Sequence, residues 1–440
     1  MCPAPPSPDA HYVRLEAPPT PSSPGSSAPA DATGTSVVAT VAILANAVMG
    51  AGILALPYAY ARSGVAGGPA LVAFAGLLNA FTMHLLSSVG RRVGQDQASF
   101  HAIAAATLPT KLWWVADAVV CLMMALVATS YLIVFANLAH AAAAPLAAHH
   151  ALVGKRYLFV VVAVVVCAPM AYAEKLGGIL RHTSTLGLIL AVYVAGLTVT
   201  SWLDAEAFEP CALQNAHHCG GTYKLFELNL KTLDAFALAT FAFTAQTQVP
   251  SLANGLADYT QAKMDAACCA AVAFCALLYC IVGHAGYETF GSLVNSDLLE
   301  SFPNTPFVAA ARIAVAFVVA TSYPLMVVPF RDSLRSILSH QTLFLRVAIW
   351  AASPRYRVAT TTMFVAASAV ACLVITDLGV VLSIVGSTAG TMVAYSIPTY
   401  AYIQTFRGDP ERTYRLLFAR CVFAYSIVAV PACLYATFLP

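Results

Sequence analysis

The sequence predicts an all-α polytopic membrane protein with about 11 transmembrane helices. The first observation is composition: 60% of the 440 residues are hydrophobic and only 10% are charged. The second is a mean hydropathy of +0.76, far above that of a soluble globular domain. The third is that apolar stretches long enough to cross a bilayer, about 20 residues each, recur along the chain.

Eleven such stretches can be counted from the first to the last third of the chain. Their ends are approximate, because boundaries are the least reliable part of a sequence-based assignment. The expected spans are 37 to 60, 65 to 89, 112 to 140, 157 to 173, 183 to 203, 234 to 253, 266 to 288, 307 to 330, 358 to 376, 379 to 403 and 416 to 438.

The loops between these spans predict the orientation. With the N-terminus in the cytoplasm, 16 Lys and Arg residues lie on the cytoplasmic side, 5 lie on the opposite side, and Arg312 lies inside a span. The positive-inside rule therefore favours a cytoplasmic N-terminus and an outward C-terminus.

Two domains are expected. Residues 1–35 are rich in Pro, Ser and Ala and predict a disordered cytoplasmic tail. Residues 36–440 form the transmembrane domain, embedded in the lipid bilayer. The net charge of +2 and the lack of a basic or aromatic stripe give no support for nucleic-acid binding. The sequence predicts no oligomeric state.

The first span contains a helix break. A polar amide, two glycines and a proline fall within its apolar run, from Asn46 to Tyr58. Unwound backbone at membrane depth is tolerated only where it is buried in protein or lines a cavity. We therefore expect an internal site at this break, with the N–H groups near Gly50, Ala51, Gly52 and Ile53 available to a carboxylate.

The sixth span contains the second candidate break. The segment from Phe241 to Pro250 includes four polar side chains, and we assign Phe241, Phe243, Thr244 and Gln246 to the substrate site. Spans one and six correspond if the first ten spans form two five-helix halves of inverted orientation. Repeat one would cover about 37–203 and repeat two about 234–403, with an extra helix at about 416–438.

Titratable groups within spans are functional candidates, although most lie near span ends and could serve structure. His84 and His284 are the candidates for a proton relay, because histidine titrates near neutral pH. The full set is His84, Asp117, His140, Asp234, His284, Glu288 and Arg312.

Two of the 12 cysteines, Cys211 and Cys219, share the long non-cytoplasmic loop. A pair this close in an oxidising compartment can close a disulfide. A metal site that also uses His217 and His218 is the alternative.

Four blocks stand out along the chain: the run Asn46–Tyr58, the run Phe241–Thr247, the Pro-containing run Tyr323–Arg331, and the glycine-rich run Asp377–Gly390 followed by Ile397 and Pro398. In this order and spacing they resemble the amino acid/auxin permease family, and particularly its sodium-coupled neutral amino acid transporters. The resemblance covers nearly all of residues 36–438.

This resemblance implies a leucine-transporter-type 5+5 inverted repeat and cation-coupled amino acid transport by alternating access. Asn46 matches an asparagine that binds the ion in sodium-coupled members, and Thr321 and Ser322 occupy the hydroxyl region that completes the site. Tyr131 resembles a position that faces the bundle core. Oxygen ligands suit Na⁺, although Asn46 could instead join helices and the two hydroxyls could bond their own helix.

The function predicted from these features is a secondary active transporter for neutral amino acids, coupled to Na⁺ or H⁺, with no cofactor. An amino-acid sensor of the same fold is the alternative. A channel calls for a continuous hydrophilic lining, and an enzyme calls for a catalytic motif such as H-E-x-x-H or G-x-S-x-G, which this sequence lacks. The plasma membrane and a lysosomal or vacuolar membrane fit the sequence equally well.

Overall fold

The computed structural model describes residues 34–94, 99–147, 152, 154–172, 177–203, 222, 224–339, 349–350 and 353–439. Apart from Gly34, these residues belong to one compact unit, Thr35–Pro440. The described part of the chain is helical and contains no β-strand, apart from an isolated bridge between Thr35 and Leu256. The predicted all-α membrane fold is therefore confirmed.

Eight helical segments in the described residues are long and apolar enough to cross a membrane, and a bent pair brings the number to nine. The count of eleven spans and the 5+5 repeat stay predictions. Two expected spans fall outside the nine: α6 (Arg156–Tyr172) has only 17 residues, and the sixth span is interrupted. The predicted tail lies among residues that the structure does not describe, apart from Gly34 and Thr35.

The long helices follow the predicted spans closely. Because the lipid-facing and buried surfaces are both apolar, the helices show little amphipathic pattern, and their packing must come from shape. The long helices are α3 (Gly67–Val93), α5 (Trp113–Ala147), α7 (Gly177–Leu203), α10 (Gln261–Phe290), α12 (Pro306–Ser339), α14 (Pro354–Val374) and α17 (Thr413–Thr437). Short elements connect them: α4 (Phe100–Thr107), η2 (Gly291–Leu293), α11 (Leu298–Ser301) and η5 (Pro410–Arg412).

The first span is broken where the glycines predict it. Helix α1 (Val37–Val48) ends and α2 (Gly52–Ala61) begins after three residues, with a bend of 59°. The N–H of Gly50 donates to the Val48 carbonyl at 2.8 Å, which replaces the regular helical bond to Asn46. Pro57 lies in the second turn of α2 and supplies no N–H of its own.

The sixth span is interrupted as well. Helix α8 (Leu230–Ala242) begins with a capping box between Asn229 and Thr232, and it ends one residue before Phe243. A single 3₁₀ turn, η1 (Gln246–Gln248), then leads into the short helix α9 (Val249–Gly255), whose second residue is Pro250. Both breaks predicted from the sequence are thus present in the backbone.

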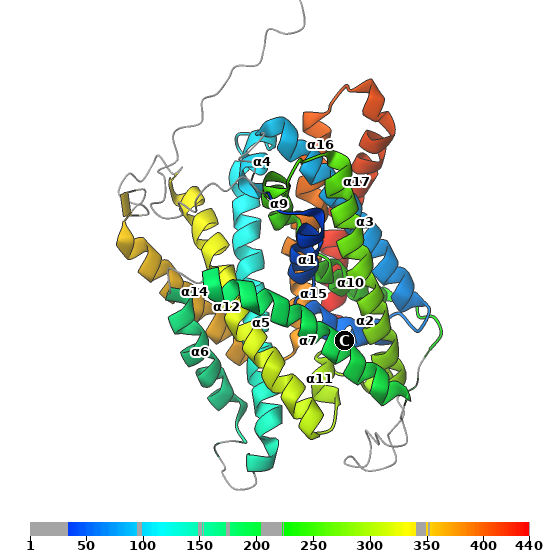
Figure 1. Ribbon diagram of the computed structural model, residues 1–440, viewed down its shortest axis with the longest axis vertical. Coiled ribbons are helices and arrows are strands. Elements are labelled where there is room, and N and C mark those ends of the chain that lie inside the picture. The colour runs from blue at the N-terminus through cyan, green and yellow to red at the C-terminus, as the bar shows by residue number, and fades with distance from the viewer. Residues whose placement is uncertain are drawn as a thin grey trace, which may run out of the picture. The chain divides into compact units, whose positions relative to one another are not determined.

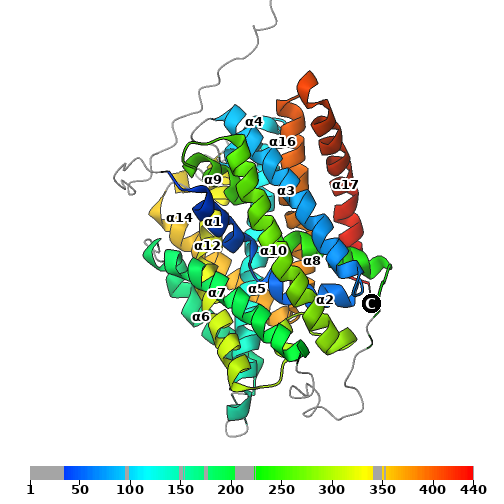
Figure 2. The ribbon, with the colours of Figure 1, turned by 45° about the vertical axis from the view of Figure 1, so that its right-hand side comes forward.

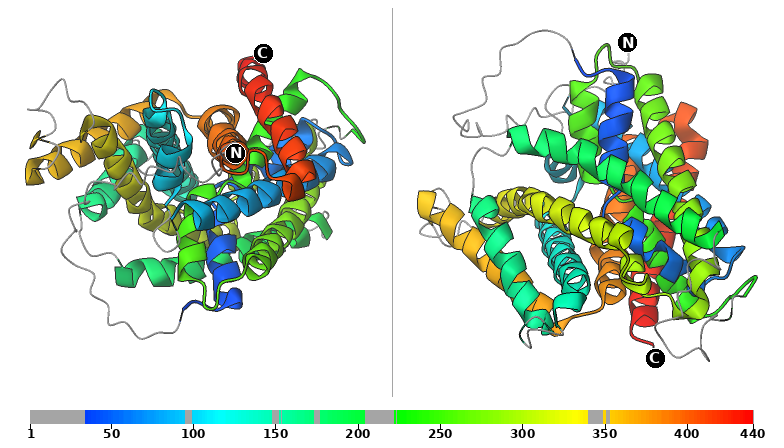
Figure 3. Two further views of the ribbon diagram at one scale, coloured as in Figure 1. Left: turned by 90° about the horizontal axis from the view of Figure 1, so that it is seen from above. Right: turned by 60° about the horizontal axis from the view of Figure 1, so that its bottom comes forward.

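The broken helices lie inside the bundle. Figure 1 shows α1 at its centre, with α10 beside it, and α10 packs on both α1 and α2. Figure 2 shows α17 at the margin next to α16 (Ile397–Thr405), on which it packs. Helices α5, α6, α12 and α14 form a second packed group, seen together in the right panel of Figure 3.

The tenth span departs from regular α-helix. It runs through α15 (Leu378–Val385), two π-helical segments, η3 (Gly386–Gly390) and η4 (Met392–Ser396), and α16. At Gly386 a Cβ would lie 1.9 Å from the Ala237 carbonyl oxygen. This glycine therefore permits close approach between the tenth span and α8, which is the role expected of small residues at membrane helix contacts.

Tyr60 fixes the position of α2. Its ring is fully buried, and a Cβ placed on Gly68 of α3 or on Gly283 of α10 would lie 2.4 Å from a ring atom. A Cβ on Gly286 would lie 2.6 Å from Pro57. Because both neighbouring helices touch α2 through glycines, the α2 half of the first span is closely packed on α3 and α10.

Candidate functional site

A cavity of about 300 Å³ lies at the break of the first span. Its walls come from α1, the break, α2, and the middle portions of α5, α7 and α12, with one residue from η1. The residues that line it are Ile43, Asn46, Ala47, Met49, Gly50, Ala51, Ile53, Leu54, Tyr131, Gly187, Leu190, Ala191, Val194, Gln248, Val315, Val318, Val319, Ser322, Leu325 and Met326.

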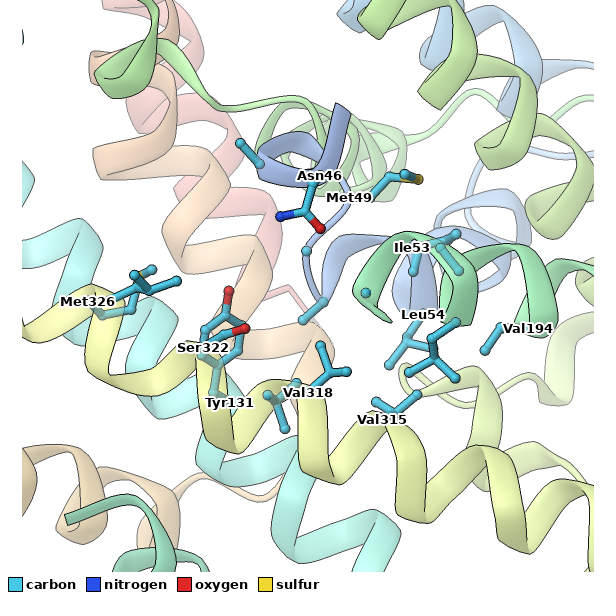
Figure 4. A pocket seen from close by; sticks show the side chains of 18 of the residues that line it. Asn46, Met49, Ile53, Leu54, Tyr131, Val194, Val315, Val318, Ser322 and Met326 are labelled. Carbon is cyan, nitrogen blue, oxygen red and sulfur yellow. The ribbon is translucent and has the colours of Figure 1, made fainter. Parts of the chain in front are cut away.

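Four polar side chains face this cavity: Asn46, Tyr131, Gln248 and Ser322. Figure 4 shows the Asn46 amide and the oxygens of Tyr131 and Ser322 at the cavity wall. Within the described part of the chain, none of the four side chains forms a hydrogen bond with the protein. Their donors and acceptors are therefore available to a ligand.

The broken backbone adds donors to this set. No acceptor for the N–H groups of Ala51, Gly52 and Ile53 is found among the described residues. These N–H groups start α2, where the helix dipole favours negative charge. The Tyr131 hydroxyl oxygen lies 3.9 Å from the position that a Cβ on Gly50 would occupy, so this side chain faces the break directly.

The remaining lining is apolar and uncharged. Aliphatic side chains of α7 and α12 cover one wall, with Met49, Ile53 and Leu54 from the first span opposite them. Among the described residues that line the cavity there is no Asp, Glu, Lys, Arg or His. A small molecule whose charges are met by backbone groups, and whose side chain is neutral, suits this lining.

The structure brings six of the predicted site residues together. Asn46, Gly50, Ala51, Ile53, Tyr131 and Ser322 all line the cavity.

Gly52, between the lining residues Ala51 and Ile53, is not itself part of the lining. A Cβ there would be 2.9 Å from both Cα and Cβ of Ala242, so the two broken spans are in close contact at Gly52.

The residues predicted from the sixth span lie outside the cavity lining. Phe243 is fully buried, with its ring packed against Tyr279 and its edge near Gly76. Phe241 packs against the buried core. The hydroxyl of Thr244, two residues past the end of α8, donates to the carbonyl of Thr240 in that helix at 2.7 Å.

Gln246 belongs to a buried polar network instead. Its amide nitrogen donates to Asn79 Oδ1 at 2.7 Å and to Thr82 Oγ1 at 3.2 Å, and its amide oxygen accepts the N–H of Ala245 at 3.0 Å. The Asn79 amide in turn donates to Tyr395 at 3.0 Å. This network anchors the second break to α3 and the tenth span.

The two predicted hydroxyls of α12, those of Thr321 and Ser322, also differ in whether they face the cavity. Thr321 donates to the carbonyls of Phe317 and Val318 in its own helix, at 3.1 and 2.9 Å. Ser322 is directed into the cavity with Asn46 and Tyr131. Of the predicted ion-binding residues, Asn46 and Ser322 therefore share one cavity and Thr321 does not.

The lining residues that the sequence did not identify are Gln248, the residues of α7, those of α12 other than Ser322, and Ile43, Ala47, Met49 and Leu54 of the first span. Gln248 follows Gln246 by two positions in the same polar run. Gly187 of α7 also lines the cavity, and a glycine is needed there because a Cβ would lie 3.1 Å from Asn46 Oδ1.

The titratable groups within spans make protein contacts outside the cavity. Asp234 is buried and forms an ion pair with Arg62, which connects α8 to the end of α2, and it also accepts a hydrogen bond from Thr437 at 3.0 Å. Arg312 donates to the carbonyls of Leu299 and Phe302.

The histidines among them pair with carboxylates or carbonyls. The shortest of these contacts joins His84 Nδ1 to Asp265 Oδ1 at 2.8 Å. His284 lies 3.5 Å from Glu288, which accepts a bond from Trp202, and His140 lies 3.2 Å from the Gly154 carbonyl.

Asp117 pairs with a histidine outside the spans. Its Oδ1 is 2.8 Å from Nδ1 of His101 in α4. This hydrogen bond raises the pKa of His101 above its usual value, although partial burial of the ring opposes the shift.

Cys211 and Cys219, with His217 and His218, lie outside the described residues. The disulfide therefore stays a prediction, as does the alternative metal site.

Comparison with known protein families adds a direct result. The family model described as "Transmembrane amino acid transporter protein" matches residues 33–439, which is nearly the whole chain. The chain belongs to this family. The resemblance to the amino acid/auxin permeases is thereby confirmed, and the chain is a multi-pass membrane transporter, which is not an enzyme.

Curated relatives of this family member are named as vacuolar transporters. The vacuolar amino acid transporter 5 of Schizosaccharomyces pombe is 27% identical over 362 residues, which are 82% of each chain. The vacuolar amino acid transporter 6 of Saccharomyces cerevisiae is 25% identical over 300 residues, covering 68% of this chain and 66% of the relative. The narrower resemblance to sodium-coupled members stays a prediction.

Proposed function

We propose that this family member moves neutral amino acids across a membrane by alternating access, driven by a Na⁺ or H⁺ gradient, with the cavity at the first break as its substrate site. The observation that carries the proposal is the set of four polar side chains around that cavity, none of which has a protein partner within the described residues. A substrate would supply the missing partners.

The backbone of the break suits the charged ends of an amino acid. The carboxylate would accept hydrogen bonds from the N–H groups at the start of α2, where the helix dipole adds favourable charge. The α-amino group would donate to polar oxygens of the cavity, such as Asn46 Oδ1 or the Tyr131 hydroxyl. Broken helices form substrate sites of this kind in transporters.

The uncharged lining supports a neutral substrate side chain. A cationic or anionic side chain would lose its water without gaining a counter-charge, which is costly in an apolar site. In a competition assay, neutral amino acids should inhibit labelled uptake strongly, whereas arginine, lysine and glutamate should not. Stronger competition by cationic amino acids would overturn this part of the proposal.

The coupling ion would bind beside the substrate. Asn46 and Ser322 offer an amide oxygen and a hydroxyl in the same cavity, and such neutral oxygen ligands suit Na⁺ without burying a carboxylate. Proton coupling is the alternative. In that case, His84 beside Asp265 and His284 beside Glu288 are the titratable groups in the described spans to mutate first.

The vacuolar names of the relatives support a vacuolar or lysosomal membrane. The excess of Lys and Arg in the predicted cytoplasmic loops supports a cytoplasmic N-terminus. A fluorescently tagged copy expressed in yeast is expected to label the vacuolar membrane. Label confined to the cell surface would contradict this placement.

The decisive experiment is uptake of labelled neutral amino acids into proteoliposomes, with a Na⁺ or an H⁺ gradient imposed in turn. Wild type is compared with Asn46→Ala and Ser322→Ala. The matched control is Thr321→Val, which removes the neighbouring hydroxyl, whose hydrogen bonds within the described residues go to its own helix.

Na⁺-driven uptake that is lost in Asn46→Ala and Ser322→Ala but kept in Thr321→Val would support the proposal with a sodium site at this cavity. H⁺-driven uptake that survives all three changes would indicate that the groups that couple transport to the ion lie outside this cavity. Saturable binding with no uptake under either gradient would reject transport and favour the sensor.

A further inference from the structure

Tyr279 of α10 connects the two broken helices. Its hydroxyl oxygen lies 2.9 Å from the carbonyl oxygen of Val48 and 2.8 Å from that of Ala242. Val48 is the last residue of α1 and Ala242 is the last residue of α8. One side chain from a third helix therefore contacts the backbone of both spans where each is interrupted.

Both contacts meet an electrostatic requirement of the breaks. Carbonyls at a helix C-terminus lack intrahelical donors and carry the negative end of the helix dipole. Gly52 touches Ala242 and both residues are buried, so the two spans lie against each other next to their breaks. The Val48 carbonyl also accepts the N–H of Gly50, whereas no other donor to the Ala242 carbonyl is found among the described residues.

The phenol has a single proton to donate. The two carbonyls must therefore share it or take it in turn. A shift of α1 away from α8 would leave the hydroxyl with one acceptor in place of two. The end of α1, which leads into the cavity-lining first break, is in this way connected to the end of α8, which does not line the cavity.

We infer that Tyr279 is a positioning residue that couples the two breaks, and through Val48 sets the backbone geometry of the substrate cavity. The inference rests on the proposed function for its transport consequences, although the backbone contacts themselves do not depend on it. Tyr279 does not line the cavity, so its effect on substrate must pass through the helix ends.

The ring has its own support. Tyr279 is fully buried, and its ring packs edge-on against Phe243 with centroids 5.0 Å apart. Tyr279→Phe removes the hydroxyl and leaves this packing in place. The matched control is Tyr323→Phe: Tyr323 is also fully buried, packs edge-on against Phe364, and bonds Ser368 at 2.7 Å, away from both breaks.

Hydrogen exchange measured by mass spectrometry on the purified full-length protein tests the coupling without requiring transport. In Tyr279→Phe, exchange is expected to accelerate about three- to ten-fold in both segments 48–52 and 242–246, the factor that corresponds to losing one hydrogen bond. In Tyr323→Phe neither segment should change. Acceleration at only one break, at neither, or equally in the control would overturn the inference.

Uptake kinetics give the second measurement. Tyr279→Phe is expected to raise the substrate KM by a similar factor, whereas Tyr323→Phe leaves KM unchanged even if both lose thermal stability. An unchanged KM in Tyr279→Phe would overturn the link to the cavity. If wild type shows no uptake at all, the proposed function fails, and the exchange experiment still decides whether Tyr279 couples the breaks.

Discussion

The amide oxygen of Asn46 lies 3.1 Å from the position that a Cβ on Gly187 would occupy. This relationship joins α1, whose end forms the first break, to α7. Because such a distance is shorter than ordinary van der Waals contact, even one methyl group on Gly187 would displace the Asn46 amide by a few tenths of an ångström.

Gly187→Ala is therefore expected to weaken transport while the protein still folds. The group that moves is the Asn46 amide, the end of a flexible side chain, so the change should distort the site more than it destabilises the fold. We expect the apparent affinity for substrate or ion to fall about three- to ten-fold. Gly196→Ala on the same helix is the control, because no described residue outside that helix's own backbone lies within 4 Å of its Cβ position. Equal effects of the two changes on uptake would count against a role for Asn46 in the site.

The two glycines of the first break should respond differently to alanine. At Gly52 a Cβ would lie 2.9 Å from the Ala242 backbone, so Gly52→Ala forces the two spans apart at a cost of about 1–3 kcal/mol. At Gly50 the nearest atom is the Tyr131 hydroxyl at 3.9 Å, so Gly50→Ala should fold normally and only reduce the cavity. Thermal stability of the purified variants distinguishes them, and a Gly50→Ala variant less stable than Gly52→Ala would contradict the contact geometry.

Asp234→Asn should destabilise the protein strongly. It leaves the Arg62 guanidinium without its buried partner, and breaking such a pair costs about 3–5 kcal/mol, with the lower value expected because Arg62 is partly exposed. Lys224→Gln breaks the Lys224–Glu227 pair, whose lysine side chain is 59% exposed, and should cost less than about 1 kcal/mol. Melting temperatures in detergent provide the comparison, and similar shifts for both variants would argue against a structural ion pair at Asp234.

The His101–Asp117 contact predicts a pH-dependent stability. The hydrogen bond between His101 and Asp117 raises the pKa of His101, so the charged form of the imidazole is favoured in the folded protein. The resulting contribution to the free energy of unfolding is complete below about pH 6.5, the pKa of histidine in the unfolded chain, and is lost as the pH rises through the pKa of His101 in the folded protein. The melting-temperature difference between wild type and His101→Gln, measured between about pH 5 and about pH 8, should therefore shrink towards higher pH. A difference that grows with pH would reverse the predicted sign.

The backbone of the site could be predicted from the sequence, whereas the direction of several side chains could not. Two closely spaced glycines after a polar amide in an apolar run favour a break, and the first break lies at Gly50 and Gly52. Thr321 and Ser322 differ by one position, about 100° around a helix. Which of the two hydroxyls faces the cavity depends on how α12 packs on α5 and α7, and the local sequence does not contain that information.

The sixth span illustrates the same limit. Its polar run predicts an interruption, and the structure places one there. After the chain leaves α8, however, a 3₁₀ turn sets the side-chain directions, and helical periodicity no longer applies. Gln246 points to Asn79, whereas Gln248 reaches the cavity. A buried amide finds its partners in three dimensions, and Asn79 lies 167 residues away in the chain.

The packing of Tyr60 between Gly68 and Gly283 has a consequence for how the sequence of this protein can diverge. Three positions on three helices occupy one volume, so a larger residue at either glycine is compatible with folding only after the tyrosine has become smaller. A smaller residue at position 60 alone would leave a void that costs stability. Substitutions at these three sites are thus contingent on one another, and we expect them to change together in divergent copies of this chain.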